Sequence, residues 1–368
     1  MKSIFSIILA IFCFTNVESQ INSSITHNGI QRTFVYYTPT NWDNTQQVPL
    51  LILLHGLTQT GSGVMDITQF NPIAEQNNFI VVYPDGENFA WNANMNVSIS
   101  TADDIGFIET LAQHFQNNFS TNPLKQYLVG FSNGGFMSHK IACESSMCFA
   151  GIATVSGNMS DTVYNNCNPQ FSPAVLHMHG TADAIVPYNG GSGTGVSVDQ
   201  TINKWKNFLF CDPTPITTDM PNTNIFDLSS PQRISYQNGL NELELIKING
   251  GGHQWPGIQT LVGGAGTINF DFYSPQYIWD FLNGKSCPSN SIKEIDENNL
   301  VWPNPASDYL YFKDKTITTF EIVDMKGNTI LKGANHNNSV FIGNLDLGMY
   351  FLILKRDDSI EYINWIKS

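Results

Sequence analysis

A serine, an aspartate and a histidine occur in this chain in an order and in local settings that suit covalent acyl transfer. Ser132 lies in LVGFSNGGFM, Asp183 in HMHGTADAIVPY and His253 in NGGGHQWPG. A serine hydroxyl is a weak nucleophile, so it needs a base that removes its proton and an acid that orients the base. The three residues are therefore predicted to be nucleophile, orienting acid and base, with Asp103 or Asp104 as the next candidates for the acid.

Two backbone N–H groups are predicted to bind the negative oxygen that forms during such a reaction. One belongs to Asn133, the residue after the proposed nucleophile. The other belongs to Leu57, which follows His55-Gly56 at the end of the apolar run PLLILL. Losing one donor of this kind typically slows a reaction about 10²–10³-fold. The turn around Gly56 is therefore expected to tolerate little change.

Further residues near these motifs allow two interpretations each. Trp91 and Trp255 could wall a substrate cleft or could be ordinary core residues. His177 and His179 alternate along a strand and face one side, so they could share a metal. No third ligand stands at a suitable spacing, so packing and hydrogen bonding are the favoured role, and neither a metal nor a cofactor is predicted. Gly257–Asn269, which contains four glycines, is predicted to form a mobile edge of the site.

The elements that must position these residues alternate between strand and helix from about residue 30 to 285. This alternation is typical of an α/β fold with a mostly parallel sheet flanked by helices. Ser132, Asp183 and His253 each follow a predicted strand. The predicted strands are 34–37, 49–54, 79–83, 126–129, 152–155, 174–179 and 243–248. The predicted helices cover 103–118, a segment from the capping box Ser197-x-x-Gln200, and a segment with Ser274 as N-cap before Pro275.

The composition changes after Cys287. Residues 288–298 are polar and charged and are predicted to be a linker. Residues 299–368 carry only strand patterns at a spacing near ten residues, which predicts a small all-β sandwich. The predicted strands there are 309–312, 320–323, 340–342, 350–354 and 362–366. No trio of residues in this segment suits catalysis.

The chain begins with MKSIFSIILAIFCFTNVESQ, in which a lysine precedes an apolar run that ends before a small-residue site. This pattern predicts a signal peptide over residues 1–19, with a hydrolase domain over 20–287; a buried N-terminal strand is the alternative. The net charge of −14 and the absence of a basic stripe argue against binding to nucleic acid. No other long apolar run is present, so no stable membrane span is predicted.

Five cysteines remain after the predicted signal peptide, and export favours disulfides. An odd number leaves one cysteine unpaired. We expect the pairs Cys143–Cys167 and Cys211–Cys287, although spacing alone does not determine the connectivity.

The motifs taken together resemble the secreted polyhydroxybutyrate depolymerase and feruloyl esterase family, relatives of carbohydrate esterase family 1. The resemblance rests on PLLILLHGLTQTG, VVYPDG, DDIGFIETL, GFSNGGFMSHKIAC, HGTADAIVPY and GGGHQWPG, and it spans about residues 30–285. It implies an α/β-hydrolase fold, a triad of Ser132, Asp183 and His253, and the oxyanion donors proposed above. Members of the family often have Ala or Ser after the nucleophile, so Asn133 is a departure.

The tail resembles the C-terminal sorting domain of type IX secretion. The resemblance rests on VWPNPASDYLYF, FEIVDMKGNTI and NLDLGMYFLIL. It implies that the tail is recognised by the type IX secretion machinery and that the protein is secreted or held on the cell surface.

The predicted function is that of a secreted serine esterase acting on polymeric esters. Aliphatic polyesters such as polyhydroxybutyrate are the first expected substrates, with polyethylene terephthalate as a further candidate. Feruloyl or acetylxylan esters of plant polysaccharide are the alternative substrates. The competing functions are those of a non-catalytic surface-binding protein on a hydrolase scaffold and of a peptidase with the same fold.

Overall fold

The computed structural model describes residues 20–95, 100–259, 265–288 and 301–367, the last range with gaps at 304, 314–315, 326, 336–337 and 357–359. The predicted signal peptide and nearly all of the predicted linker lie outside these residues. The chain divides into two compact units, 1–289 and 290–368. Among the described residues, no helix is both long and apolar enough to cross a membrane.

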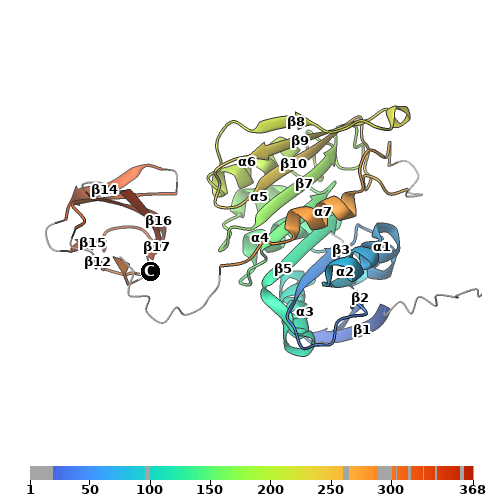
Figure 1. Ribbon diagram of the computed structural model, residues 1–368, viewed down its shortest axis with the longest axis horizontal. Helices are drawn as coiled ribbons and strands as arrows, with labels where there is room; N and C mark the ends of the chain where they lie inside the picture. The colour runs from blue at the N-terminus through green and yellow to red at the C-terminus, as the bar shows by residue number, and fades with distance from the viewer. Residues whose placement is uncertain are drawn as a thin grey trace, which may run out of the picture. The chain divides into compact units, whose positions relative to one another are not determined.

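One ten-stranded sheet forms the centre of the first unit (Figure 1). Its spatial order is β1-β2-β4-β3-β5-β6-β7-β10-β9-β8. The middle of the sheet, from β4 to β10, is parallel, and the pairs at both edges are antiparallel. The strands are β1 Gln20–His27, β2 Ile30–Tyr37, β3 Val48–Leu54, β4 Ile80–Pro84, β5 Thr121–Phe131, β6 Gly151–Val155, β7 Ala174–Gly180, β8 Ile216–Asp219, β9 Ser230–Tyr236 and β10 Leu243–Asn249.

Helices cover both faces of this sheet, which explains why its middle strands are buried over most of their length. One face carries α3, α4, α5 and α6, and the other carries α1, α2 and α7 (Figure 1). The α-helices are α1 Gly61–Thr68, α2 Phe70–Asn77, α3 Asp104–Phe119, α4 Asn133–Glu144, α5 Asp161–Asn166, α6 Val198–Phe208 and α7 Ser274–Leu282. Two single 3₁₀ turns, η1 Glu87–Phe89 and η2 Ile225–Asp227, lie in the loops.

The elements predicted from sequence are confirmed, with ends that differ by a few residues. The capping box at the start of α6 is present, since Ser197 and Gln200 exchange side-chain and backbone hydrogen bonds. The prediction that Ser274 caps α7 is wrong. Tyr273 is the N-cap, and the Ser274 hydroxyl instead donates to the carbonyl of Pro256 at 2.6 Å.

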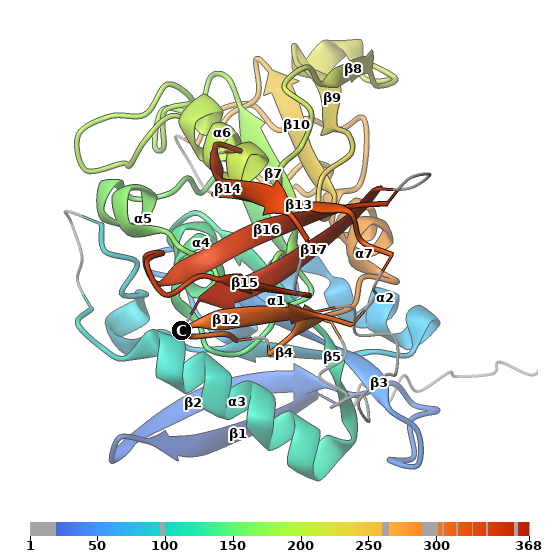
Figure 2. The same ribbon diagram turned by 90° about the vertical axis from the view of Figure 1, so that its left-hand side faces the viewer.

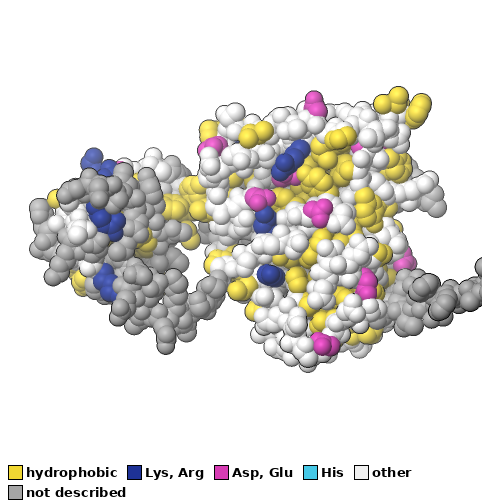
Figure 3. Space-filling view, viewed as in Figure 1, with side chains coloured by type: hydrophobic (Ala, Val, Ile, Leu, Met, Phe, Trp, Pro, Cys, Tyr) yellow, Lys and Arg dark blue, Asp and Glu magenta, His cyan; other side chains and the backbone are white. Residues whose placement is uncertain are grey.

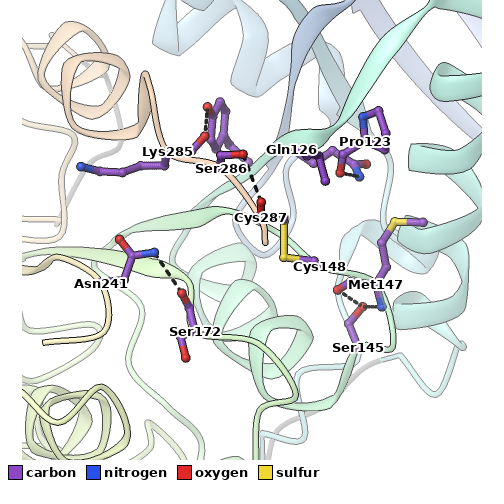
Figure 4. The surroundings of a disulfide bond; sticks show 12 residues. Pro123, Gln126, Ser145, Met147, Cys148, Ser172, Asn241, Lys285, Ser286 and Cys287 are labelled. Atoms are coloured by element: carbon purple, nitrogen blue, oxygen red, sulfur yellow. Dashed lines mark hydrogen bonds between the residues drawn. A yellow bond between two sulfur atoms is a disulfide. The ribbon is translucent and has the colours of Figure 1, made fainter. Parts of the chain in front are cut away.

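Two disulfides tie the first unit together. The predicted pair Cys143–Cys167 is confirmed, with Cα atoms 4.9 Å apart. The predicted pair Cys211–Cys287 is wrong, because Cys287 is bonded to Cys148 and Cys211 is a free thiol. After α7 the backbone N–H of Cys287 donates to the carbonyl of Leu124 at 2.8 Å, which brings it beside the loop that holds Cys148 (Figure 4).

The second unit contains two small antiparallel sheets (Figure 2). One has the order β11-β12-β15 and the other β14-β13-β16-β17. Apolar residues from both sheets form one cluster, as the predicted sandwich requires. The strands are β11 Val301–Trp302, β12 Tyr309–Phe312, β13 Thr319–Val323, β14 Thr329–Ala334, β15 Ser339–Phe341, β16 Gly348–Lys355 and β17 Ile360–Lys367.

Charged side chains are sparse on the face of the first unit that Figure 3 shows. Asp, Glu, Lys and Arg lie scattered there among hydrophobic and uncharged groups, and they form no continuous basic stripe (Figure 3). This distribution agrees with the low charged fraction of the chain, 13%.

Candidate active site

Ser132 occupies the sharp turn between β5 and α4. Its backbone angles are φ 52° and ψ −119°, a conformation that a residue with a side chain rarely adopts. The turn is held from both sides. The N–H of Ser132 donates to the carbonyl of Val155 at 2.9 Å, and its carbonyl accepts from the N–H of Phe136 at 3.0 Å. This is the strained strand–turn–helix setting in which a hydrolase exposes its nucleophile.

Two glycines make this turn sterically possible. A Cβ atom on Gly130 would lie 2.1 Å from the carbonyl oxygen of Gly134. A Cβ atom on Gly134 would lie 2.2 Å from the carbonyl oxygen of Leu54. Neither contact can be relieved by a side-chain rotation, because the atoms approached belong to the backbone. The Gly-x-Ser-x-Gly pattern is therefore a packing requirement in this chain.

Asp183 and His253 form a buried pair at the ends of β7 and β10. The Nδ1 atom of His253 lies 2.8 Å from Oδ2 of Asp183. An ionised carboxylate only accepts hydrogen bonds, so Nδ1 carries the proton and Nε2 remains as the basic nitrogen. Both His253 and Ser132 line the same pocket. The structure thus brings together the three residues that the sequence motifs predicted as a set.

The carboxylate of Asp183 is surrounded by N–H donors. Its Oδ1 accepts from the backbone of Ile185 at 2.9 Å and of Val186 at 2.8 Å. Its Oδ2 lies near His253 and, at 3.4 Å, near Nε2 of His179. Burial by itself would raise the pKa of Asp183, but the hydrogen bonds from His179 and His253 outweigh it, and the pKa lies well below its usual range. The group is therefore ionised and fixed in orientation at neutral pH.

The pocket above Ser132 has a volume of about 440 Å³, within the range of roughly 300–1,000 Å³ usual for small-molecule sites. Its walls are largely apolar. Trp91, Met95 and Phe131 contribute to the lining, and so do the exposed side chains of Leu57 and Ile185. Of these, the sequence had indicated Trp91 as a possible wall of the cleft and Leu57 as a backbone donor. Phe131 and Ile185 lie inside the motifs around Ser132 and Asp183 but had been given no role, and Met95 lies outside any motif.

The two predicted oxyanion donors also lie at this pocket. Leu57 and Asn133 both line it, one after β3 and the other at the first position of α4. Within the described part of the chain, neither backbone N–H has a hydrogen-bond acceptor. Two such groups beside the proposed nucleophile Ser132 could bind an oxygen that becomes negative.

The side chain of Asn133 clamps the loop that carries Trp91. Its Oδ1 accepts from the backbone N–H of Trp91 at 2.7 Å, and its Nδ2 donates to the carbonyl of Trp91 at 3.2 Å. The indole Nε1–H of Trp91 in turn donates to the carbonyl of His55 at 2.9 Å. Asn133, the departure noted in the sequence, thus fixes the pocket wall at Trp91 through its side chain.

His55 secures the same loop from the other side. Its Nε2 accepts from the N–H of Gly86 at 2.9 Å, which leaves the proton on Nδ1, 2.7 Å from the carbonyl of Gly56. Burial lowers the pKa of His55, in keeping with a neutral ring. The turn that presents Leu57 is therefore held by backbone and side-chain bonds together.

Trp255 lies behind the pocket. It is buried, and its ring stacks on Phe131 with centroids 5.6 Å apart. The ring of Phe131 in turn packs against the ring of His253, with centroids 5.0 Å apart. Trp255 is absent from the pocket lining. For this residue we therefore propose support of Phe131 and the His253 loop in place of the predicted substrate contact.

The predicted mobile edge at Gly257–Asn269 is only partly described, because residues 260–264 lie outside the described ranges. Its two ends meet, since the N–H of Gly257 donates to the carbonyl of Asn269 at 2.7 Å.

His177 and His179 lie in the packing and hydrogen-bonding setting expected for them. Both are buried, and their rings stack with centroids 5.3 Å apart. In the described part of the chain, no group of three or more His, Cys, Asp or Glu side chains could hold a metal ion.

Comparison with known proteins identifies two regions. Residues 26–207 match the family described as putative esterase, and residues 300–367 match the secretion system C-terminal sorting domain. The second match indicates a protein that is secreted or displayed on the cell surface.

Curated relatives agree with the first match. A probable feruloyl esterase C from Aspergillus clavatus is 27% identical over 181 residues, which is 48% of this chain and 62% of the relative. A feruloyl esterase C from Emericella nidulans is 27% identical over 183 residues, or 48% of this chain and 61% of the relative. The chain thus spans about three fifths of the length of these two relatives.

Among solved structures, an acetyl xylan esterase from Aspergillus awamori superposes with a TM-score of 0.52 at 15% identity. The superposition covers 71% of this chain and 98% of that one, and at this identity it speaks for the fold alone. The first unit has the α/β-hydrolase fold. By sequence, residues 26–207 match the putative esterase family, and residues 300–367 match the secretion system C-terminal sorting domain.

Proposed function

We propose that the protein is a secreted serine esterase that hydrolyses feruloyl and related esters of plant polysaccharide. The observation that carries this proposal is the Asp183–His253 pair, which lies at 2.8 Å and opens onto the pocket that Ser132 lines. A scaffold kept only for binding has no need for a strained serine, a buried acid–base pair and two free N–H groups at one pocket.

The proposed reaction has two similar halves. The Nε2 atom of His253 takes the proton of the Ser132 hydroxyl while Oγ bonds to the ester carbonyl carbon. The carbonyl oxygen becomes negative and accepts from the N–H groups of Leu57 and Asn133. The alcohol leaves with the proton from His253, and an acyl-enzyme remains. Water then attacks in the same way and releases the acid.

The pocket walls support an aromatic acyl group. Trp91 and Phe131 lie in the walls, and the more exposed side chains of Leu57 and Ile185 add apolar area beside Met95. A flat aromatic acid gains contact on such walls, whereas an acetyl group leaves most of a 440 Å³ pocket unfilled. The names of the curated relatives, feruloyl esterase C, point to the same substrate class. Among the expected substrates, the plant-polysaccharide alternative is therefore better supported than polyhydroxybutyrate or polyethylene terephthalate.

The test is a panel of substrates offered to the purified full chain. Methyl ferulate is expected to be hydrolysed with a higher kcat/KM than p-nitrophenyl acetate, acetylated xylan, or films of polyhydroxybutyrate and polyethylene terephthalate. Ser132→Ala should abolish turnover of all of them while leaving the circular dichroism spectrum unchanged. Undiminished turnover in Ser132→Ala would refute the nucleophile. A polyester film hydrolysed faster than methyl ferulate would refute the substrate class.

The sorting domain gives the second unit a separate proposed role. Residues 300–367 would be bound by the type IX secretion machinery during export, so the esterase would meet polymers too large to enter a cell.

A further inference from the structure

A row of buried polar side chains runs behind Asp183, from helix α6 through α4, β6 and β7. No member is more than 1% exposed. In order toward Asp183, the members are Trp205, His139, Thr154, His177 and His179.

Each member lies within hydrogen-bond reach of the next. Nε1 of Trp205 lies 3.1 Å from Nδ1 of His139, and Nε2 of His139 lies 3.3 Å from Oγ1 of Thr154. Oγ1 of Thr154 lies 2.7 Å from Nδ1 of His177. Nε2 of His177 then lies 3.2 Å from Nδ1 of His179. The row is continuous over its whole length.

The two ends of the row fix the direction of every bond in it. The indole nitrogen of Trp205 can only donate, so Nδ1 of His139 must accept. At the other end, Nε2 of His179 lies 2.8 Å from the carbonyl oxygen of Val186, which can only accept, so this nitrogen carries the proton. The same N–H faces Oδ2 of Asp183 at 3.4 Å.

The bonds in between follow from these two ends. With its proton on Nε2, His179 accepts at Nδ1 from Nε2–H of His177. His177 then accepts at Nδ1 from the Thr154 hydroxyl, whose oxygen accepts from Nε2–H of His139. All bonds point one way, toward Asp183. Each of the three histidines is neutral with its proton on Nε2, the opposite tautomer to His253 and His55.

Strand register explains how distant residues form this row. In the parallel β6–β7 ladder Thr154 pairs directly with His177. His177 and His179 are two residues apart on one strand, so their side chains share a face. That face is covered by α4, which supplies His139, and by α6, which supplies Trp205. The row therefore depends on elements that also support Ser132 and Asp183.

We propose that this row positions the catalytic acid: His179, its tautomer set by His177, Thr154, His139 and Trp205, holds Asp183 in the orientation that its bond to His253 requires. The inference rests on the proposed function, since it assigns Asp183 to the triad. The members of the row touch no substrate and act through Asp183, so they are positioning residues.

The charge states of the row agree with this role. Burial lowers the pKa of His139 to about 3, although a backbone bond to Gly157 works against the shift. Burial and the neighbouring histidines lower the pKa of His177 well below its ordinary value. Both rings are therefore neutral at working pH, as a one-directional chain of donors requires.

The first test reads the tautomers by ¹⁵N NMR of the imidazole nitrogens in the wild-type full chain, with resonances assigned by single His→Gln variants. His139, His177 and His179 should each carry one proton, on Nε2, at pH 7. His253 and His55 should carry theirs on Nδ1. A charged His177 or His179, or either one protonated on Nδ1, would overturn the proposal. This test needs no variant of the row that must stay active.

The second test removes the hydroxyl that links His139 to His177, by an isosteric substitution of Thr154. Thr154→Val should lower kcat for p-nitrophenyl butyrate about tenfold and leave KM unchanged, because a hydrogen bond near a charged group is lost while the pocket is intact. Thr68→Val is the matched control, since it removes a buried hydroxyl that donates to Val64 in α1, away from the row. It should leave kcat unchanged.

Asp183→Asn measured in the same series separates the two proposals. If it is inactive while Thr154→Val turns over within twofold of wild type, the row has no positioning role and the triad stands. If Asp183→Asn is as active as wild type, the proposed acid is wrong, and the role of the row fails with it.

Discussion

The two sides of the pocket are held in different ways. On the acid–base side, Asp183 and His253 act through side-chain atoms, and buried neutral histidines stand behind them. On the oxyanion side, the proposed donors are backbone N–H groups of Leu57 and Asn133, and side chains serve only to fix the loops. The first side should therefore be sensitive to isosteric changes of single atoms. The second should respond only to changes that move the backbone.

The largest effect is expected from the acid itself. Asp183→Asn should lower kcat about 10³–10⁴-fold, because an amide no longer holds His253 in the tautomer that leaves Nε2 basic. The fold should persist, since the amide oxygen can still accept from the N–H groups of Ile185 and Val186. Stopped-flow or steady-state assays with p-nitrophenyl butyrate measure the change. Asp161→Asn, at an exposed position in α5, is the control and should be neutral.

A decrease of less than tenfold in Asp183→Asn would mean that the acid lies elsewhere. The acid–base side would then not depend on single side-chain atoms, and the contrast with the oxyanion side would disappear.

The second expected effect is a loss of stability at acidic pH. Its cause is the pair of buried histidines behind the acid–base side, His139 and His177. His139 and His177 are neutral in the fold because burial lowers their pKa, to about 3 for His139. In the unfolded chain each binds a proton below about pH 6.5. The free energy of unfolding is therefore unaffected by the titration of these two histidines above that pH. Below it, the free energy of unfolding decreases by about 1.4 kcal/mol per pH unit for each histidine.

Urea unfolding between pH 7 and pH 5 measures this slope. His139→Gln should reduce the slope by the contribution of one histidine, about 1.4 kcal/mol per pH unit. A free energy of unfolding that stays constant over this range would show that these rings do not stay neutral in the fold.

A smaller effect is expected on the oxyanion side. Asn133→Ala keeps the backbone N–H but removes both bonds that clamp Trp91. Turnover of methyl ferulate should decrease about 10–100-fold, the equivalent of one or two hydrogen bonds in a closed site. A crystal structure of the variant should show the Trp91 loop displaced. Turnover equal to wild type would mean that the clamp does not position the donors.

The smallest effect should come from Trp91→Phe. This change removes the bond from the indole N–H to the carbonyl of His55 and part of the ring packing against His55, and it keeps both backbone bonds to Asn133. We expect a decrease of about threefold to tenfold in kcat/KM, less than for Asn133→Ala. Parallel assays of the two variants give the ranking. If Trp91→Phe were the more damaging, the ring and not the backbone clamp would organise this wall.

The sequence alone was informative wherever a feature is encoded within one short segment of the chain. The strands before Ser132, Asp183 and His253 could be predicted because short runs rich in apolar residues between turns mark buried strands. The elbow could be predicted because the Gly-x-Ser-x-Gly spacing itself is visible in the sequence, although the contact that requires Gly134 is made with the distant Leu54. The all-β tail was equally clear from its alternating strands.

The sequence was uninformative wherever two distant segments meet. Cys287 pairs with Cys148 because the chain after α7 returns to the start of β5, a path that no spacing encodes. Trp255 lies behind Phe131, and the motif GGGHQWPG does not indicate on which side of the loop the ring of Trp255 lies.

The residues with proposed roles in catalysis were thus determined by the sequence, and their support was decided by the tertiary structure. Motif order and strand ends bring Ser132, Asp183 and His253 to one edge, because the carboxyl ends of parallel strands lie together. The row from Trp205 to His179 and the clamp of Asn133 on Trp91 have no motif. They arise from strand register and from helices packed across the sheet, and hydrogen bonds between such elements depend on distances that only the folded chain sets.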